Sequence, residues 1–138
     1  MKVIRSKVLG FCMGVRRAAA LAAREAENVK LTSGRVLTLG PLIHNPAALD
    51  ELKKRGVEEV AESSHDLKSN SLVICAHGID PRFEEDLRGK GAFIIDATCP
   101  KVKESQLKAK ALAEKGFTLF LAGEVKHAEI IGILGYAG

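Results

Sequence analysis

The stretch SLVICAHGIDPRFEEDLRGKGAFIIDATCP, residues 71–100, decides the fold of this chain. An apolar run at 71–75 is followed by a helical segment that opens at Asp80-Pro81, and a second apolar run follows at 92–95. Aspartate before proline is a typical helix start, because the carboxylate caps free N–H groups and proline fits the first helical position. A strand, a helix and a second strand in this order predict a βαβ unit with parallel strands.

The same alternation of short β-rich runs and helical stretches extends along the whole chain. Strands are predicted over residues 2–9, 35–39, 58–60, 71–75, 92–95 and 117–121. Helices are predicted over residues 15–29, 46–55, 64–68, 81–88 and 100–115, with another opening near Lys126. The apolar share of 46%, with few aromatic residues, suits helices packed on a parallel sheet. The predicted fold class is therefore α/β, an open parallel sheet with helices on both faces in a three-layer αβα arrangement.

The length of 138 residues suits one main domain with a real core. A new unit begins at residues 123–129, and residues 130–138 then stop within what should be further structure. A parallel sheet needs cover on both faces. We therefore expect a first α/β domain over residues 1–98 and the beginning of a second, incomplete α/β unit over residues 99–138.

Charge and cysteine content narrow the class of protein. The net charge is +4, but the basic residues fall in helix-like stretches that also carry acidic residues. No basic stretch is interleaved with aromatic residues for base stacking, so nucleic-acid binding is the least favoured of the functions considered. The apolar run before Arg5 is too short for a signal peptide or a membrane span, which favours a soluble cytoplasmic protein. Three cysteines in a reducing compartment indicate metal binding, catalysis or burial.

Cysteine or histidine follows nearly every predicted strand. These residues are Cys12, His44, Cys75, His77, Cys99 and His127. Because the carboxyl ends of parallel strands share one edge of a sheet, we expect these side chains to gather in one crevice. A metal ion or a cluster is the first ligand to suspect there.

Cys12 and Cys99 occupy the same architectural position. Cys12 lies between Gly10 and Gly14 and Cys99 precedes Pro100, so each thiol sits at a tight turn into a helix, where the helix dipole favours the thiolate. Cys75 ends the apolar run 72–74, and a core position is favoured for it over a role as third ligand.

His44, His77 and His127 predict an anion site, since imidazoles beside helix starts donate hydrogen bonds to phosphate oxygens. Glu129 follows His127 by two residues and is a candidate proton donor or an ordinary acid of a first helical turn. His65 lies in a polar connection and is assigned to the surface.

Five blocks of sequence, in order, resemble the LytB family of 4-hydroxy-3-methylbut-2-enyl diphosphate reductases, which act in the non-mevalonate isoprenoid pathway. They are GFCMGV at 10–15 with Arg17-Ala18, Ile43-His44-Asn45 followed by Leu52 and Arg55-Gly56, AHG at 76–78, DATCP at 96–100 and HAE at 127–129. The first and fourth blocks are highly specific, and the histidine blocks are moderately so.

The resemblance implies an iron–sulfur enzyme. Members hold a [4Fe-4S] cluster through three cysteines and use two electrons to remove the substrate's hydroxyl group as water, giving isopentenyl and dimethylallyl diphosphate. Cys12 and Cys99 match two of the cluster cysteines. The three histidines match residues that hold the diphosphate, and Glu129 matches the acid that supplies protons. Reduced ferredoxin or flavodoxin is the implied electron donor.

The chain also departs from the family pattern. The family's third cluster cysteine lies beyond residue 138, Cys75 stands where serine is common, and HAE replaces His-Pro-Glu at 127–129. We therefore expect an N-terminal part that is inactive alone. The alternative is a non-catalytic zinc-binding module in which Cys12, Cys75, Cys99 and His77 form a tetrahedral site.

Overall fold

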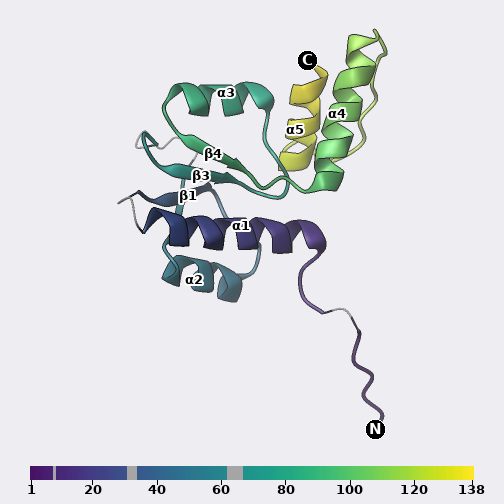
Figure 1. The fold of residues 1–138 in the computed structure, drawn as a ribbon. Coiled ribbons are helices and arrows are strands. Elements are labelled where there is room, and N and C mark those ends of the chain that lie inside the picture. The colour runs from purple at the N-terminus through teal and green to yellow at the C-terminus, as the bar shows by residue number, and fades with distance from the viewer. Residues whose placement is uncertain (8, 31–33, 62–66) are drawn as a thin grey trace.

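The computed structural model describes residues 1–138 except 8, 31–33 and 62–66, and it has an α/β architecture (Figure 1). The helices are α1 (Met13–Val29), α2 (Pro46–Lys54), α3 (Pro81–Gly89), α4 (Pro100–Glu114) and α5 (Ala128–Ala137). The strands are β1 (Val36–Leu39), β2 (Val57–Val60), β3 (Ser71–Ile74) and β4 (Phe93–Asp96). These four strands match four of the predicted ones to within one or two residues.

The four strands form one parallel sheet in the order β2-β1-β3-β4. The chain leaves β1 in one direction to reach β2 and then crosses back to β3 on the other side of β1. Val36 is level with both Val57 and Ser71, and Ser71 is level with Phe93, so the strands end at nearly the same height. The predicted open parallel sheet is confirmed.

Helices cover both faces of this sheet (Figure 1). Helices α1 and α2 lie on one face and α3 lies on the other, while α4 and α5 lie side by side beyond the sheet. Neighbouring residues of a strand point to opposite faces, so Val36 packs toward α1 and α2 while Leu37 packs toward α3. Both faces are therefore hydrophobic cores, as a parallel sheet requires.

Small residues bring α1 close to the sheet. Gly14, Ala18, Ala22 and Ala26 recur every fourth residue and are all buried. This spacing places them on one face of the helix. The short side chains let the α1 backbone approach the strands, which fixes the position of the loop before α1.

Capping residues fix the starts of α2 and α3 as the sequence predicts. Asn45 Oδ1 accepts a hydrogen bond of 3.0 Å from the N–H of Ala48, and Asp80 Oδ1 accepts one of 2.8 Å from the N–H of Arg82. Helices α2, α3 and α4 all begin with proline. Each of these helix starts follows a loop at the carboxyl edge of the sheet, so the caps also fix that edge.

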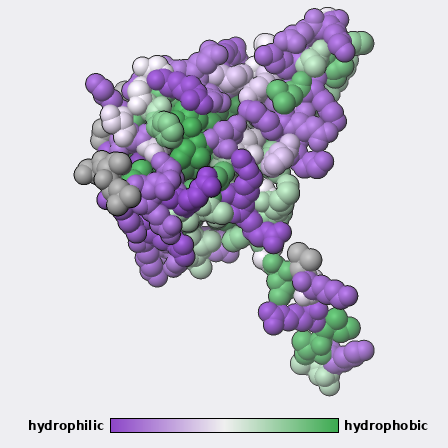
Figure 2. Space-filling model, in the orientation of Figure 1, coloured by the Kyte–Doolittle hydropathy of each residue, from purple (hydrophilic) through white to green (hydrophobic). Residues whose placement is uncertain are grey.

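The two outer predicted strands are wrong. Residues 2–7 and 9 form no strand, and Figure 2 shows the N-terminal segment extending away from the body, with Val3 79% exposed. Residues 117–121 are not in a strand either, and Phe120 is 97% exposed. A strand needs a neighbour for its backbone hydrogen bonds, and neither segment has one within the described chain.

Of two further predicted helices, one lies mostly outside the described residues and the other is present. The predicted helix at 64–68 lies mostly outside the described residues, and Leu67 and Lys68 are not helical. The helix expected near Lys126 begins at Ala128. None of the helices within the described parts of the chain is both long and apolar enough to cross a membrane.

The buried face of α1 generates a stability prediction. Ala22 is 0% exposed, so Ala22→Leu should force α1 away from the sheet and lower the free energy of unfolding by about 1–3 kcal/mol. Ala20 lies on the exposed face of the same helix, and Ala20→Leu should change stability by less than about 0.5 kcal/mol. Urea denaturation of the two variants measures the difference, and equal losses would contradict this packing.

Candidate functional site

The order of the strands creates a crevice at the carboxyl edge of the sheet. Connections leave β1 and β3 in opposite directions, and ligands of open α/β sheets bind where this reversal occurs. His44 lies in the loop after β1 and His77 in the loop after β3. The two predicted histidines therefore flank the reversal point.

The three histidines that the sequence assigns to an anion site lie together. The ring centroids of His44 and His77 are 6.3 Å apart, and those of His77 and His127 are 5.4 Å apart in an edge-on arrangement. His77 is the central ring of the three. Their loops come from three parts of the chain separated by more than thirty residues each, so only the tertiary fold joins them.

The environment of His77 disfavours its charged form. Burial lowers the pKa of His77, and the positive charge of His127 lowers it further. His44 acts in the same direction, whereas the carboxylate of Glu129 opposes them. A dianionic or trianionic ligand among these rings would offset the repulsion between their positive charges, because a nearby negative charge favours protonated imidazole.

Helix α5 supplies both His127 and Glu129. His127 is the N-cap residue, and its Nδ1 accepts a hydrogen bond of 3.3 Å from the N–H of Glu129. Glu129 is exposed in the first turn, and its charge acts on His77. The predicted proton donor and the histidines thus share one region, and the positive end of the α5 dipole faces it.

The two predicted cluster cysteines are both helix N-cap residues. Cys12 precedes α1 and is exposed, and Cys99 precedes α4 and is partly buried. A methyl group at Gly14 would lie 2.8 Å from both Cβ and Sγ of Cys99. The side chain of Cys99 therefore packs against the first turn of α1, directly after Cys12, and only glycine leaves room for it.

Backbone hydrogen bonds join the cysteine loop to the histidine loop. The N–H of Cys99 donates to the carbonyl of Ala76 at 2.9 Å, next to His77. Arg17 of α1 donates through Nη1 to the carbonyl of Thr98 at 3.1 Å. Cys99 is thereby fixed between α1 on one side and the His77 loop on the other.

Asp96 is a supporting residue whose role the sequence did not reveal. Its carboxylate accepts from the N–H of Thr98 at 2.9 Å and lies 3.1 Å from Nζ of Lys103, which also donates to Tyr136 Oη at 2.7 Å. Burial acts to raise the pKa of Asp96, but the hydrogen bonds from Thr98 and Lys103 outweigh it and hold the pKa below its usual value. The stabilisation is present above the ordinary aspartate pKa and is lost as the pH falls.

Gln106 is a second supporting residue that no sequence pattern indicated. Its side chain is 1% exposed, and neither amide atom has a hydrogen-bond partner among the described residues. A methyl group at Gly78 or at Gly132 would lie 2.5 Å or 2.8 Å from its Nε2. Gln106 of α4 therefore lies between the His77 loop and α5, and both glycines are needed to admit it.

Cys75 lies apart from the other two thiols in role and surroundings. It is partly buried at the end of β3, its Sγ is 3.8 Å from Nδ1 of His77, and burial raises the pKa of its thiol. No three Cys, His, Asp or Glu side chains within the described chain are arranged to hold a metal ion. The four residues of the alternative zinc site, Cys12, Cys75, Cys99 and His77, do not form such a group in the described part of the chain, although Cys75 contacts His77.

Comparison with known families agrees with this geometry. The model of the family described as LytB protein matches residues 3–138. The chain belongs to the LytB family. The resemblance that the sequence blocks indicated is thus confirmed over nearly the whole chain.

Individual LytB relatives give the same result. The 4-hydroxy-3-methylbut-2-enyl diphosphate reductase of Nitratidesulfovibrio vulgaris (strain Miyazaki F) is 42% identical over 100% of this chain and 48% of its own length. That of Treponema denticola is 45% identical over 99% of this chain and 48% of its own length. A solved structure of such a reductase, described as the terminal enzyme of the non-mevalonate pathway, is 44% identical and has a TM-score of 0.82. The match covers 92% of this chain and 44% of the chain in that structure. The chain spans about half the length of the relatives it matches.

The contact between α1 and Cys99 gives a test of this LytB site. Gly14→Ala should displace Cys99 and lower the free energy of unfolding by about 1–3 kcal/mol, although alanine favours helix. Gly89→Ala is the matched control, because a methyl group at this helical glycine meets nothing within 4 Å and should stabilise by up to about 1 kcal/mol. Urea denaturation gives both values, and stabilisation by Gly14→Ala would show that Cys99 does not pack there.

Proposed function

We propose that this chain is the N-terminal part of a 4-hydroxy-3-methylbut-2-enyl diphosphate reductase. In the reaction, the substrate gains two electrons and two protons, its allylic C–O bond breaks, and water leaves, giving isopentenyl or dimethylallyl diphosphate. The observation that carries the proposal is the joining of two sets of residues. The hydrogen bond from the N–H of Cys99 to the carbonyl of Ala76 joins a cysteine at a helix start to the loop of His77, whose ring lies next to those of His44 and His127.

His44, His77 and His127 would bind the diphosphate of the substrate. The ring of His77 lies 6.3 Å from that of His44 and 5.4 Å from that of His127, and the N-terminus of α5 adds its dipole. The negative charge of a bound anion opposes the effects that lower the pKa of His77. The affinity for diphosphate is therefore expected to increase as the pH falls through the histidine range.

The donor set at Cys12 and Cys99 fits an iron–sulfur cluster. Both cysteines are N-cap residues of helices, and the side chain of Cys99 packs against Gly14, two residues after Cys12, so the donor set is of the kind that such clusters use. A [4Fe-4S] cluster, when bound, passes electrons from ferredoxin or flavodoxin to the substrate. Two thiolates hold a cluster less firmly than the three that family members use, so the cluster is expected to be labile in this chain.

Glu129 would deliver protons to the bound substrate. It is exposed in the first turn of α5, two residues from His127, and its charge acts on the ring of His77. A carboxyl group is a suitable general acid when it lies within reach of the substrate atom that takes up the proton. The imidazoles hold the anionic end of the substrate, and Glu129 acts next to them.

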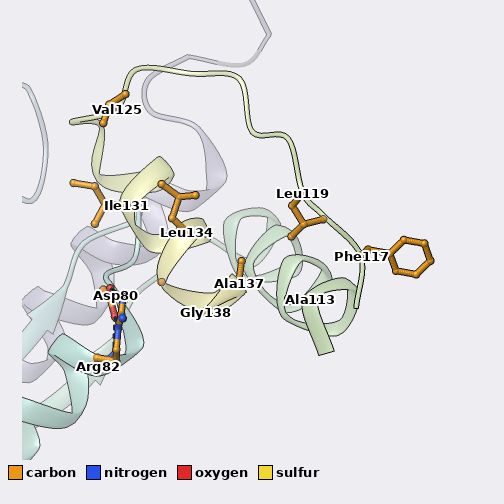
Figure 3. Close-up of a pocket in the computed structure, with 11 residues that line it drawn as sticks. Asp80, Arg82, Ala113, Phe117, Leu119, Val125, Ile131, Leu134, Ala137 and Gly138 are labelled. Atoms are coloured by element: carbon orange, nitrogen blue, oxygen red, sulfur yellow. Dashed lines mark hydrogen bonds and ion pairs between the residues drawn. The ribbon is translucent and has the colours of Figure 1, made fainter. Parts of the chain in front are cut away.

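We also propose that residues 1–98 are one α/β domain and that residues 99–138 begin a second. Helices α4 and α5 pack mainly on each other and lie beyond the sheet (Figure 1). A cavity of about 580 Å³ lies beside them, between the end of α4, the segment after it and α5. Figure 3 shows the residues that line it. Its walls are mainly apolar, with Leu119, Val125, Ile131 and Leu134 exposed or half-buried, and none of the predicted site residues lines it.

This apolar surface supports the proposal that more structure packs on the second unit. Phe117 is 60% exposed with its ring pointing outward in Figure 3, and the neighbouring Phe120 is almost fully exposed. Residues 117–121 are the segment predicted as a strand. In a complete α/β unit, neighbouring strands would pair with this segment and cover these side chains.

Binding of inorganic diphosphate to the 138-residue chain tests the histidine site. His44→Gln, His77→Gln and His127→Gln should each weaken binding by about tenfold or more at about pH 6, because each removes an imidazole that contacts the anion. Lys54→Gln, which removes an exposed positive charge at the other end of α2, should leave the affinity within about twofold. Isothermal titration calorimetry measures these constants, and equal effects of all four substitutions would show attraction by net charge alone.

Anaerobic reconstitution with iron and sulfide tests the cluster part of the proposal. The chain alone should hold iron well below the four atoms of a [4Fe-4S] cluster and lose it quickly to a chelator. Cys12→Ser and Cys99→Ser should each lower the iron content further, and Cys75→Ser should not. Iron and sulfide assays with visible absorption provide the measurement. A stable, stoichiometric cluster in this chain, or equal dependence on Cys75, would contradict the assignment, and retained zinc would favour the zinc module.

A further inference from the structure

The thiol of Cys75 lies against the central histidine of the site. Its Sγ is 3.8 Å from Nδ1 of His77, which is within hydrogen-bonding range for sulfur. Cys75 is the last position before the loop that carries His77, and it packs against the core between the sheet and α1. Cys75 is not among the residues proposed to hold the cluster or the substrate.

Both partners of this contact are electrically neutral near pH 7 and above. Burial raises the pKa of the Cys75 thiol, and burial together with the nearby His127 lowers the pKa of His77. His44 also lowers the pKa of His77, and Glu129 opposes these effects. A neutral thiol and a neutral imidazole can form this contact in two ways, with S–H donating to Nδ1 or Nδ1–H donating to the sulfur.

The strengths of the two acceptors favour the first of these two arrangements. The N–H of Gly78 donates to the carbonyl oxygen of Cys75 at 3.1 Å, so the contact of the sulfur itself is the one with Nδ1 of His77. Sulfur is a weak acceptor, whereas an unprotonated imidazole nitrogen is a good one. The thiol proton is therefore the group that fills the contact with Nδ1.

We propose that Cys75 is a positioning residue that donates its S–H to Nδ1 of His77 and so holds the proton of the neutral ring on Nε2. The other ring nitrogen then stays a donor without any need for the ring to take up a further proton. This inference rests on the proposed function in one respect, since the donor would point to a diphosphate oxygen. The tautomer itself is a property of the free chain.

Nitrogen-15 NMR of the 138-residue chain with labelled histidine, without ligand and at about pH 8, tests the proposal. His77 should show an unprotonated, hydrogen-bonded Nδ1 and a protonated Nε2. Cys75→Ser keeps a donor at this position and should keep that pattern. Cys75→Ala removes the donor, so the Nδ1 shift should move to the value of an unbonded nitrogen while the His44 and His127 shifts stay in place.

Two spectroscopic results would overturn the proposal: a protonated Nδ1 in the unsubstituted chain, or an unchanged His77 spectrum in Cys75→Ala. The first needs no variant, so it holds even if Cys75→Ala folds poorly. Affinity for inorganic diphosphate at the same pH is measured separately, and it should fall about threefold to tenfold in Cys75→Ala and be restored in Cys75→Ser. If the tautomer is as expected but the unsubstituted chain does not bind diphosphate, the proposed function fails and the role of Cys75 in setting the tautomer stands.

Discussion

The backbone hydrogen bonds that continue between β3 and β4 beyond the ends of the strands hold the candidate site together. The N–H of Ala97 donates to the carbonyl of Ile74 at 3.2 Å, and the N–H of Cys99 donates to that of Ala76 at 2.9 Å. These bonds extend the parallel ladder into the two loops, so the loops run side by side. A residue placed in one loop is thereby fixed relative to residues in the other, and this constraint brings a cysteine next to a histidine.

The remaining parts of the site are attached to this pair of loops. Arg17 of α1 donates a hydrogen bond to the carbonyl of Thr98. Because Gly14 has no Cβ, the side chain of Cys99 fits against the first turn of α1. On the other side, Gln106 lies between Gly78 of the His77 loop and Gly132 of α5, the helix whose N-cap is His127. The same few contacts thus help to position two thiols, three imidazoles and one carboxylate that come from separate parts of the chain.

Local sequence patterns predicted the elements whose causes are local. Asn45 and Asp80 cap helices by reaching three or two residues along the chain, and proline then fixes the first helical position, so these helix starts could be read directly. The grouping of the histidines followed from a general property of parallel sheets and needed no contact to be known. What the structure adds to that prediction is the distances between the rings.

The errors and omissions have non-local causes. Residues 117–121 have the composition of a strand, but strand formation depends on a partner that the described chain does not provide. The burial of Gln106 depends on two glycines in other elements, and the contact of Cys75 with His77 depends on how the loop after β3 turns back. Neither arrangement leaves a periodic trace in the sequence. The core position preferred for Cys75 agrees with its burial, but its histidine partner was not foreseen.

The most direct test is whether the thiols of Cys12 and Cys99 face each other across the start of α1. Dibromobimane becomes fluorescent only when it bridges two nearby thiols, and it can be applied to the folded chain with Cys75→Ser to leave these two cysteines. The structure predicts rapid fluorescence and a single linked peptide pair that contains residues 12 and 99, and urea should abolish it. Attachment at one thiol only, with no bridged pair in the folded chain, would contradict the common pocket.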